Sequence, residues 1–448
     1  MGRIFGTDGV RGLANRDLTA ELAVDLAVAA AHVLGERGAF ADSRPTAVVA
    51  RDTRVSGEFL ESAVVAGLAS AGVDVHRLGV VPTPGCAFLT QHLDADMGVM
   101  ISASHNPMPD NGIKFLGRGG HKLDDAIERQ IEDRLEEPWD RPTGAAVGRV
   151  GDSRAGLGEY VRHLVRTSPA RLDGLRVVLD CAHGAAYEVG PEAFAALGAE
   201  VVAINASPDG TNINEAAGST HPESLQAAVV AHQAHAGFAF HGDAARCLAG
   251  DADGELVDGD QILAILALAA QEAGSLTGDT VVVTQMSNLG FVQAMERSGI
   301  VCVRTAVGDR YVLEAMRAGS FALGGEQSGH VIIAEHATTG DGVLAAIQLA
   351  ARMRATGRSL ADLATVMTRL PQVLVNVPDV DRSRSGTDPV LQGAVAAASG
   401  ALAGRGRVLL RPSGTEPLVR VMVEAPTSDE AERVADDLAA VVRAQLAL

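Results

Sequence analysis

The sequence is poor in aromatic residues, lysine and cysteine, and it contains no long hydrophobic run. Phe, Trp and Tyr make up 3% of the 448 residues, whereas 47% are hydrophobic and 50 are glycine, a balance typical of closely packed α/β layers. No apolar run reaches the roughly 18 residues that a membrane helix needs. The four cysteines form no C-x-x-C pair, which favours buried thiols in a reducing compartment over a disulfide framework. They are Cys86, Cys181, Cys247 and Cys302.

Positive charge is also scarce. The formal net charge of −19 argues against a nucleic-acid partner and against an acidic membrane surface. Any phosphate site must therefore be a local cluster of arginines and helix N-termini. The first residues, MGRIFGTDGVRG, contain no apolar segment of the kind found in a secretion signal, so we expect a cytoplasmic protein.

Lysine is almost absent. The chain has 35 Arg but only two Lys, Lys114 and Lys122. Arginine supplies almost all of the positively charged side chains. A lysine in such a sequence could therefore be required for its compact amine, which can release a proton where a guanidinium cannot. Chance is the alternative explanation. On this ground Lys114 becomes a candidate functional residue.

Three segments repeat one pattern. PTAVVARDTR (45–54), LRVVLDCAHG (175–184) and TVVVTQMSNLG (280–290) are β-branched runs that end in a polar loop. A helix-like segment and a second strand follow each of them, which is the unit of parallel or mixed α/β sheets. The sequence therefore predicts three similar α/β domains with mixed sheets. A shorter α+β domain follows them.

Looser composition marks the expected boundaries. EEPWDRPTGAAVGRVGDSR (136–154) is predicted to be a linker. The domains are predicted at residues 1–150, 151–252, 253–369 and 370–448.

The segment GVMISASHNPMPDNGIKF (98–115) carries the sharpest chemical signal. A buried strand ends in a tight polar loop in which Ser104 could be an exposed nucleophile, while backbone N–H groups cradle a phosphate. A lone serine in such a loop more often caps a turn. The downstream Lys114 changes this balance, because it brings an amine to the same loop system.

Two further loops carry polar groups suited to a phosphosugar. FALGGEQSGHVI (321–332) offers Glu326 and Ser328 to sugar hydroxyls and His330 for proton transfer, although a hairpin with a structural histidine is the alternative. LLRPSGTEPLVRVMVE (409–424) resembles an anion receptor, with small residues that expose backbone N–H groups and guanidinium groups that grip phosphate. Its residues are Arg411, Ser413, Gly414, Thr415 and Arg420.

Together with FGTDGVRG (5–12), these segments closely resemble the α-D-phosphohexomutase superfamily from end to end, and most nearly its bacterial phosphoglucosamine mutase branch. The resemblance implies four domains around a cleft, and a phosphorylated Ser104 that passes its phosphoryl group to the sugar. The implied reaction interconverts glucosamine 6-phosphate and glucosamine 1-phosphate through glucosamine 1,6-bisphosphate, which is both intermediate and activator. The product would supply UDP-N-acetylglucosamine and peptidoglycan synthesis.

The same resemblance assigns roles to individual residues. Arg11, Lys114 and Arg246 would neutralise the moving phosphoryl group, and Lys114 or His330 would exchange a proton with the sugar hydroxyl. His105, Glu326 and Ser328 would contact the substrate. The loop that contains Arg411 and Arg420 would hold the phosphate that does not react.

One loop departs from the family. The family's metal loop reads D-G-D-A-D-R, with three aspartates binding Mg²⁺, whereas GFAFHGDAAR (237–246) has His241 and Ala245 at the first and third of these positions. The candidate metal ligands are therefore Ser104, Asp243 and His241. Because Mg²⁺ prefers hard oxygen ligands, its binding should be weakened. A protonated His241 could instead partly mimic the missing ion.

Several readings of the chain stay open at this point. It could be a mutase with an altered metal site, an inactivated mutase, or a non-catalytic sugar-phosphate-binding pseudo-mutase. Phosphomannomutase/phosphoglucomutase is the alternative activity within the superfamily, and a phosphatase is a weaker one. The expected partner is a small phosphosugar, with no nucleic acid and no membrane, and the expected state is a monomer or homodimer.

Overall fold

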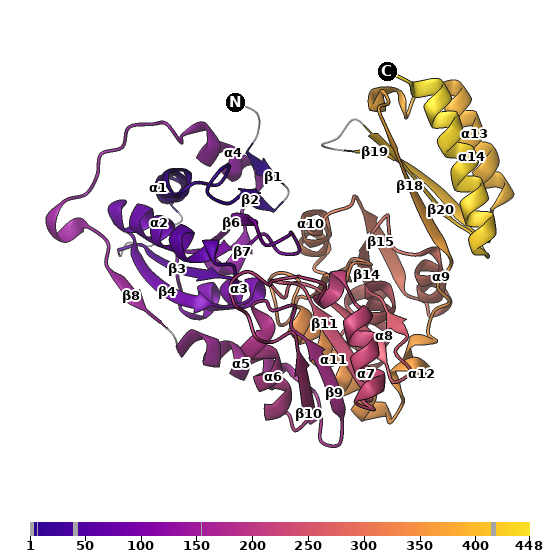
Figure 1. Cartoon of the computed structure of the whole chain (residues 1–448), viewed down its shortest axis with the longest axis horizontal. Coiled ribbons are helices and arrows are strands. Elements are labelled where there is room, and N and C mark those ends of the chain that lie inside the picture. Colours follow the sequence, from indigo (N-terminus) through magenta and orange to yellow (C-terminus); the bar gives the residue numbers. More distant parts are fainter. Residues whose placement is uncertain (1–3, 7, 39–43, 154, 414–417) are drawn as a thin grey trace. The chain divides into compact units, whose positions relative to one another are not determined.

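A computed structural model of the chain describes residues 4–6, 8–38, 44–153, 155–413 and 418–448 (Figure 1). The chain divides into two compact units. Unit 1 combines Met1–Gln285 with Val301–Thr365, and unit 2 combines Met286–Ile300 with Val366–Leu448. No helix among the described residues is both long and apolar enough to cross a membrane.

Unit 1 contains three sheets that repeat one strand order. In each, a first strand lies between a parallel second strand and a parallel third strand, and a fourth strand pairs antiparallel with the third. This repeat confirms the predicted set of similar α/β segments with mixed sheets. In chain order the four strands are β3 (Thr46–Arg51), β4 (Asp74–Val80), β5 (Met97–Ile101) and β6 (Asp110–Gly117) in the first sheet; β9 (Arg176–Asp180), β10 (Glu200–Ile204), β11 (Ala236–Phe240) and β12 (Cys247–Asp251) in the second; and β14 (Thr280–Thr284), β15 (Val301–Thr305), β16 (Leu323–Gly325) and β17 (Val331–Ile333) in the third.

Short strands extend the first two sheets, and helices complete unit 1. The added strands are β1 (Phe5–Gly6), β2 (Gly9–Leu13), β7 (His121–Lys122) and β8 (Val150–Asp152) in the first sheet and β13 (Leu256–Val257) in the second. The helices are α1 (Ala20–Glu36), α2 (Ser56–Ser70), α3 (Thr83–His92), α4 (Asp125–Asp133), α5 (Ala155–Thr167), α6 (Ala186–Ala196), α7 (Glu223–Ala231), α8 (Gly259–Glu272), α10 (Asp309–Gly319), α11 (Gly342–Thr356) and α12 (Leu360–Ala364).

The central strands are hydrophobic along their whole length because both faces are covered. All five residues of β5, MGVMI, and all five of β11, AGFAF, are buried. Such continuous apolar runs are typical of parallel strands inside α/β layers. Each run ends in a polar loop. Ser104 lies in the loop after β5 and Asp243 in the loop after β11, so a buried strand positions each of them.

Helix boundaries follow local capping chemistry. The Asp258 side chain accepts from the backbone N–H of Gln261, and the Gln261 side-chain oxygen accepts from the backbone N–H of Asp258, so a capping box starts α8. Asp341 accepts from the backbone N–H of Leu344 at the start of α11, and Gly357 ends that helix in the left-handed conformation.

The segment 136–154 is not wholly the linker that its composition predicts. Residues 150–152 form β8, which pairs parallel with β4 at the edge of the first sheet. The pairing is possible because β4 would otherwise present an unpaired edge. A three-residue strand among glycines and charged residues gives too weak a periodic signal to be seen in sequence.

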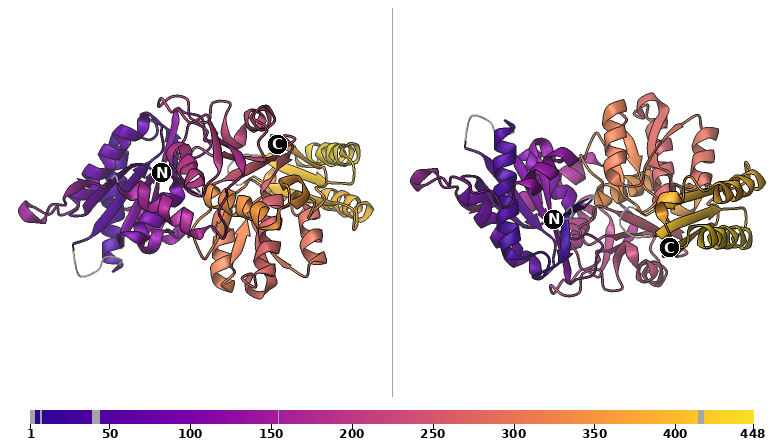
Figure 2. Two further views of the ribbon diagram at one scale, coloured as in Figure 1. Left: turned by 90° about the horizontal axis from the view of Figure 1, so that it is seen from below. Right: turned by 90° about the horizontal axis from the view of Figure 1, so that it is seen from above.

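Unit 2 is a small α+β assembly, as predicted. The strands form one antiparallel sheet in the order β18–β20–β19, and α13 and α14 pack against each other and against this sheet (Figure 1, Figure 2). Helix α9 belongs to this unit through a hydrogen bond from the Leu289 backbone N–H to Glu424. The elements are α9 (Leu289–Arg297), β18 (Gln372–Pro378), α13 (Pro389–Ala401), β19 (Arg407–Pro412), β20 (Leu418–Glu424) and α14 (Ser428–Leu446).

Candidate active site

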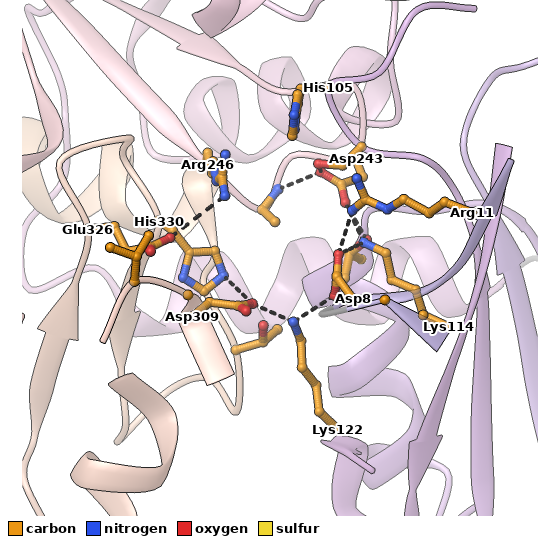
Figure 3. Close-up of a pocket in the computed structure, with 18 of the residues that line it drawn as sticks. Asp8, Arg11, His105, Lys114, Lys122, Asp243, Arg246, Asp309, Glu326 and His330 are labelled. Carbon is orange, nitrogen blue, oxygen red and sulfur yellow. Dashed lines mark hydrogen bonds and ion pairs between the residues drawn. The ribbon is translucent and has the colours of Figure 1, made fainter. Parts of the chain in front are cut away.

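Unit 1 contains a polar cavity of about 390 Å³ that Ser104 lines, and we call it the Ser104 cavity (Figure 3). Residues from all three repeated sheets meet there. The first sheet and its loops supply Asp8, Arg11, Ser104, His105, Lys114 and Lys122; the loop between β11 and β12 supplies Asp243 and Arg246; and the segments around α10 and the β16–β17 loop supply Asp309, Glu326 and His330.

Ser104 sits in a strained loop that a buried arginine supports. Ser104 has φ +55°, a left-handed conformation that is uncommon outside glycine. The fully buried Arg54 guanidinium donates to the backbone carbonyls of Ser104 (3.1 Å), Asn106 (2.8 Å) and Pro107 (2.6 Å). It also pairs with Asp52 at 3.0 Å. Because one planar group satisfies three loop carbonyls, it fixes the backbone that carries the hydroxyl.

Replacing Arg54 by Met should therefore destabilise unit 1 strongly. Asp52 would be left as an uncompensated buried charge, which typically costs about 3–5 kcal/mol of unfolding free energy. The matched control is Arg16→Met, which removes an exposed pair with Asp17 and should cost about 0–1 kcal/mol. Urea unfolding measures both values, and equal losses in the two variants would contradict the supporting role.

Four cationic side chains line the Ser104 cavity, and carboxylates hold them in place. Lys114 Nζ lies 2.8 Å from Asp8 and 3.1 Å from Asp243, while Arg11 lies 2.7 Å from Asp8. Burial opposes ionisation of Asp8, but Lys114, Lys122 and Arg11 outweigh it and hold the pKa of this carboxyl well below its usual range. Arg246 lies 3.7 Å from Glu326, whose pKa is raised by burial.

The Ser104 hydroxyl is bound to the one carboxylate of the unusual loop. Ser104 Oγ donates to Asp243 Oδ1 at 2.9 Å. Burial opposes ionisation of Asp243, but the Lys114 ammonium outweighs it and holds the pKa of that carboxyl well below its usual range. A charged acceptor thus orients a buried hydroxyl in a cavity rich in cations, an arrangement suited to holding a phosphoryl group.

The donor set of this loop does not fit Mg²⁺. The two oxygens of Asp243 already accept from Ser104 Oγ (2.9 Å), Ala245 N (3.4 Å), Thr83 Oγ1 (2.9 Å) and Lys114 Nζ (3.1 Å). These four donors fill the acceptor sites of one carboxylate. A hard cation that requires octahedral oxygen ligands would have to displace an ammonium group. Within the described residues, no three His, Cys, Asp or Glu side chains gather to hold a metal ion.

His241 lies beside the serine as a neutral ring. Its Nδ1 is 3.5 Å from Ser104 Oγ, and its ring lies 5.3 Å from that of His105. Burial, and then Arg246, lower the pKa of His241 well below its usual range. Burial, and then the nearby Arg246, therefore disfavour the protonated His241 that was considered as a partial replacement for the missing ion.

The structure brings most of the predicted site residues into the cavity, but not all. Ser328 is exposed on the β16–β17 loop and does not line the cavity. Arg411 and Arg420 face each other on β19 and β20 of unit 2, and burial, followed by Arg420, lowers the pKa of Arg411. Ser413 follows β19 in the same unit. Gly414 and Thr415 lie outside the described residues.

Several residues of the cavity were not singled out from the sequence. Among them are Asp8, Thr83, Lys122 and Asp309. A signal existed for Lys122, because it is the second of only two lysines. Asp8 and Asp309 stand next to glycines in FGTDGVRG and TAVGDR, but their partners come from other segments of the chain. Only the fold reveals those pairings.

A buried serine hydroxyl among cations, on three repeated α/β sheets, defines a phosphohexomutase, an isomerase that transfers a phosphoryl group within one sugar. Family models of phosphoglucomutase/phosphomannomutase match the whole architecture, and the chain belongs to this family. Domain I of the family matches residues 2–140, domain II 158–254, domain III 258–370 and the C-terminal domain 373–441.

Similar proteins carry a more specific name. The phosphoglucosamine mutases of Nocardioides sp. (strain ATCC BAA-499 / JS614) and of Thermobifida fusca (strain YX) are 67% and 61% identical over 448 residues, with both chains fully covered. Among solved structures, a phosphoglucomutase/phosphomannomutase family protein from Burkholderia thailandensis has a TM-score of 0.83 at 24% identity and covers 100% of this chain and 99% of its own. Aspergillus fumigatus N-acetylphosphoglucosamine mutase, in complex with GlcNAc-6P and magnesium, has a TM-score of 0.68 at 18% identity, with 98% and 96% covered. These two structures support the fold.

Proposed function

We propose that this chain interconverts glucosamine 6-phosphate and glucosamine 1-phosphate. The observation that carries the proposal is the Ser104 hydroxyl, held by Asp243 in a cavity that Arg11, Lys114, Lys122 and Arg246 line. The similarity to phosphoglucosamine mutases over the full chain supports the choice of an amino sugar.

The proposed reaction moves a phosphoryl group through Ser104. The bond between phosphorus and Ser104 Oγ breaks as a bond to the sugar oxygen forms, and the sugar hydroxyl loses a proton. Glucosamine 1,6-bisphosphate results, and transfer of its other phosphoryl group back to Ser104 completes the isomerisation. Arg11, Lys114 and Arg246 neutralise the charge that develops, which is the main contribution of a protein to phosphoryl transfer. Lys114 or His330 exchanges the proton with the sugar hydroxyl.

The remaining residues bind substrate in this proposal. His105, Glu326 and Ser328 contact the sugar, and the carboxylate of Glu326 is suited to sugar hydroxyls because it lies buried in the cavity wall. The phosphate that does not react is held by Arg411, Ser413, Gly414, Thr415 and Arg420. A guanidinium pair such as Arg411 and Arg420, on adjacent strands, can grip one phosphate from two sides.

We also propose that Mg²⁺ binds this chain weakly. Only Ser104, Asp243 and His241 remain as candidate ligands, and Asp243 is already engaged by four donors.

The altered loop also favours a second candidate function, a pseudo-mutase that binds phosphosugars without turnover. A cytoplasmic location and a monomeric or homodimeric state stay predictions of the sequence.

Turnover of three phosphosugars tests the proposed function. Glucosamine 6-phosphate, glucose 6-phosphate and mannose 6-phosphate are each incubated with the protein and a trace of the matching bisphosphate, and the 1-phosphates are followed by ³¹P NMR. We expect glucosamine to give the highest kcat/KM. Dominance of mannose or glucose would favour phosphomannomutase/phosphoglucomutase, release of inorganic phosphate would favour a phosphatase, and binding without turnover would favour a pseudo-mutase.

A further inference from the structure

An asparagine of the second repeat holds the Ser104 loop, which comprises residues 102–107. The side-chain nitrogen of Asn214 donates to the backbone carbonyls of Ser104 (2.9 Å) and Asn106 (3.1 Å). Asn214 lies in the connection between β10 and α7, 110 and 108 positions away from these two residues. Both acceptors are carbonyl oxygens, so the N–H₂ end of the amide faces them. One side chain thus ties the loop after β5 to the second sheet.

The same two carbonyls also accept from Arg54. Its Nη2 lies 3.1 Å from the carbonyl oxygen of Ser104 and 2.8 Å from that of Asn106. A carbonyl oxygen has two lone pairs, so each of the two accepts one bond from the guanidinium and one from the amide. The guanidinium belongs to the first repeat and the amide to the second. The backbone of the Ser104 loop is therefore fixed relative to both repeats.

The backbone at position 214 suits an asparagine. Its φ is +60°, in the left-handed region that asparagine adopts more readily than most residues. The Asn214 N–H donates to the carbonyl of the fully buried Ala182 at 2.9 Å. The amide also packs against Gly242, where an added Cβ would lie 3.0 Å from Asn214 Nδ2. The donor group therefore stands on a well-anchored backbone and has little room to turn away.

The second repeat holds Ser104 at two points, which respond differently to phosphorylation. Asp243 accepts from Ser104 Oγ at 2.9 Å, and Asn214 donates to the Ser104 carbonyl. When a bisphosphate transfers its phosphoryl group to Oγ, the hydroxyl proton passes to the sugar oxygen that the phosphorus leaves. The Oγ bond to Asp243 is then lost, because an ester oxygen has no proton to donate, and the phosphate repels the carboxylate. The bond from Asn214 needs no proton from Ser104.

We propose that Asn214 is a positioning residue that holds the Ser104 loop while Ser104 carries the phosphoryl group. The inference rests on the proposed function, which supplies that group. Once the Oγ bond to Asp243 is lost, the amide of Asn214 and the guanidinium of Arg54 still hold the loop. Asn214 does not line the Ser104 cavity, so it acts through the backbone of Ser104 and not on the substrate.

Glycine and aspartate at position 214 remove the donor in two ways. Both residues tolerate a left-handed backbone. Asn214→Gly deletes the amide, whereas Asn214→Asp keeps its shape but turns an oxygen toward the two carbonyls. We expect kcat to fall on the order of tenfold in Asn214→Gly and at least as far in Asn214→Asp, with KM within about twofold, because the lost bonds position Ser104. A rise in KM with unchanged kcat would overturn the positioning role.

Hydrogen–deuterium exchange tests the loop with and without phosphorylated Ser104. The N–H groups of Ser104 and Asn106 are bonded to Ser102 Oγ (2.9 Å) and to the Ala103 carbonyl (3.1 Å), so loosening of the loop exposes them. Incubation with glucosamine 1,6-bisphosphate gives the phosphoenzyme, and intact mass spectrometry gives the phosphorylated fraction. We expect Asn214→Gly to speed exchange roughly threefold in the unphosphorylated chain and on the order of tenfold in the phosphoenzyme. Equal increases in the two forms would overturn the inference.

Asn205 supplies the matched control. It also follows β10 with a left-handed φ of +47°, but its side-chain nitrogen reaches Ser224 Oγ at 3.4 Å, outside the Ser104 loop. Asn205→Gly should leave kcat and the exchange of the Ser104 loop unchanged. Equal effects of the two glycine substitutions would refute the role of Asn214. If the bisphosphate leaves no phosphate on Ser104, the proposed function fails, and exchange in the unphosphorylated chain still decides whether Asn214 holds the loop.

Discussion

Replacing Ser104 by Ala should reduce the interconversion of glucosamine phosphates by roughly 10⁴-fold or more, because the variant lacks the serine hydroxyl that carries the phosphoryl group in the proposed reaction. Ser104 Oγ is the serine oxygen bound to Asp243 at 2.9 Å inside the cavity. The Ala side chain fits the same space, so the variant should remain folded. Discontinuous assays with ³¹P detection measure the rate, and intact mass spectrometry after incubation with glucosamine 1,6-bisphosphate measures the phosphorylated fraction.

A serine outside the cavity provides the control for this loss. Ser62 on α2 donates to the Glu58 carbonyl of its own helix, and Ser62→Ala should keep both the rate and the phosphorylated fraction. Turnover in Ser104→Ala at a rate near that of the unchanged chain would sink the assignment of Ser104 as phosphoryl carrier. Phosphorylation at a different serine would do the same.

The double substitution His241→Asp and Ala245→Asp should raise the rate on the order of 10²-fold and create tight, stoichiometric Mg²⁺ binding. Both positions are buried next to Ser104 and Asp243, and the substitutions raise the number of carboxylates in the loop from one to three. Three carboxylates provide the hard oxygen ligands that Mg²⁺ requires, and a bound metal ion typically contributes several kcal/mol to charge stabilisation. Titration calorimetry and kcat measure the two effects.

Neutral amides distinguish ligand charge from shape. The variant with Asn at both 241 and 245 has nearly the same size but adds no carboxylate, so it should show neither gain. Tight stoichiometric Mg²⁺ binding by the unchanged chain at Ser104 and Asp243 would contradict the proposal of a weak site. If the double aspartate variant gains nothing, the comparison of this loop with the family's metal loop is wrong.

The fold was predictable where the pattern is local. Strand, helix and strand alternate in PTAVVARDTR and in the two similar segments, and the polar loops at the ends of buried strands marked Ser104 and Asp243. The strand order within each sheet was not predictable in this way, since it depends on pairings between distant segments. The strand β8 was missed for the same reason, because only its pairing with β4 distinguishes it from a linker.

The site was predictable as a set of residues, but not as a set of partners. Arg11, Lys114, Arg246 and His330 were identified from motifs and line one cavity. The contact of Lys122 with Asp309 spans 187 positions, and the contact of Lys114 with Asp243 spans 129. Such long-range ion pairs leave no periodic trace in the sequence. The pKa of His330, which burial lowers to about 4, likewise depends on where the fold places the ring.

The location of both lysines has a practical consequence for chemical labelling. Lys114 and Lys122 have side chains that are 8% and 15% exposed, and the other 35 of the 37 Lys and Arg residues are arginines, which amine reagents do not modify. Apart from the α-amino group, every nucleophilic amine of this protein therefore lies in the Ser104 cavity. Succinimide esters should find almost no target on the outer surface, so amine-directed cross-linking and dye conjugation will report on access to this cavity.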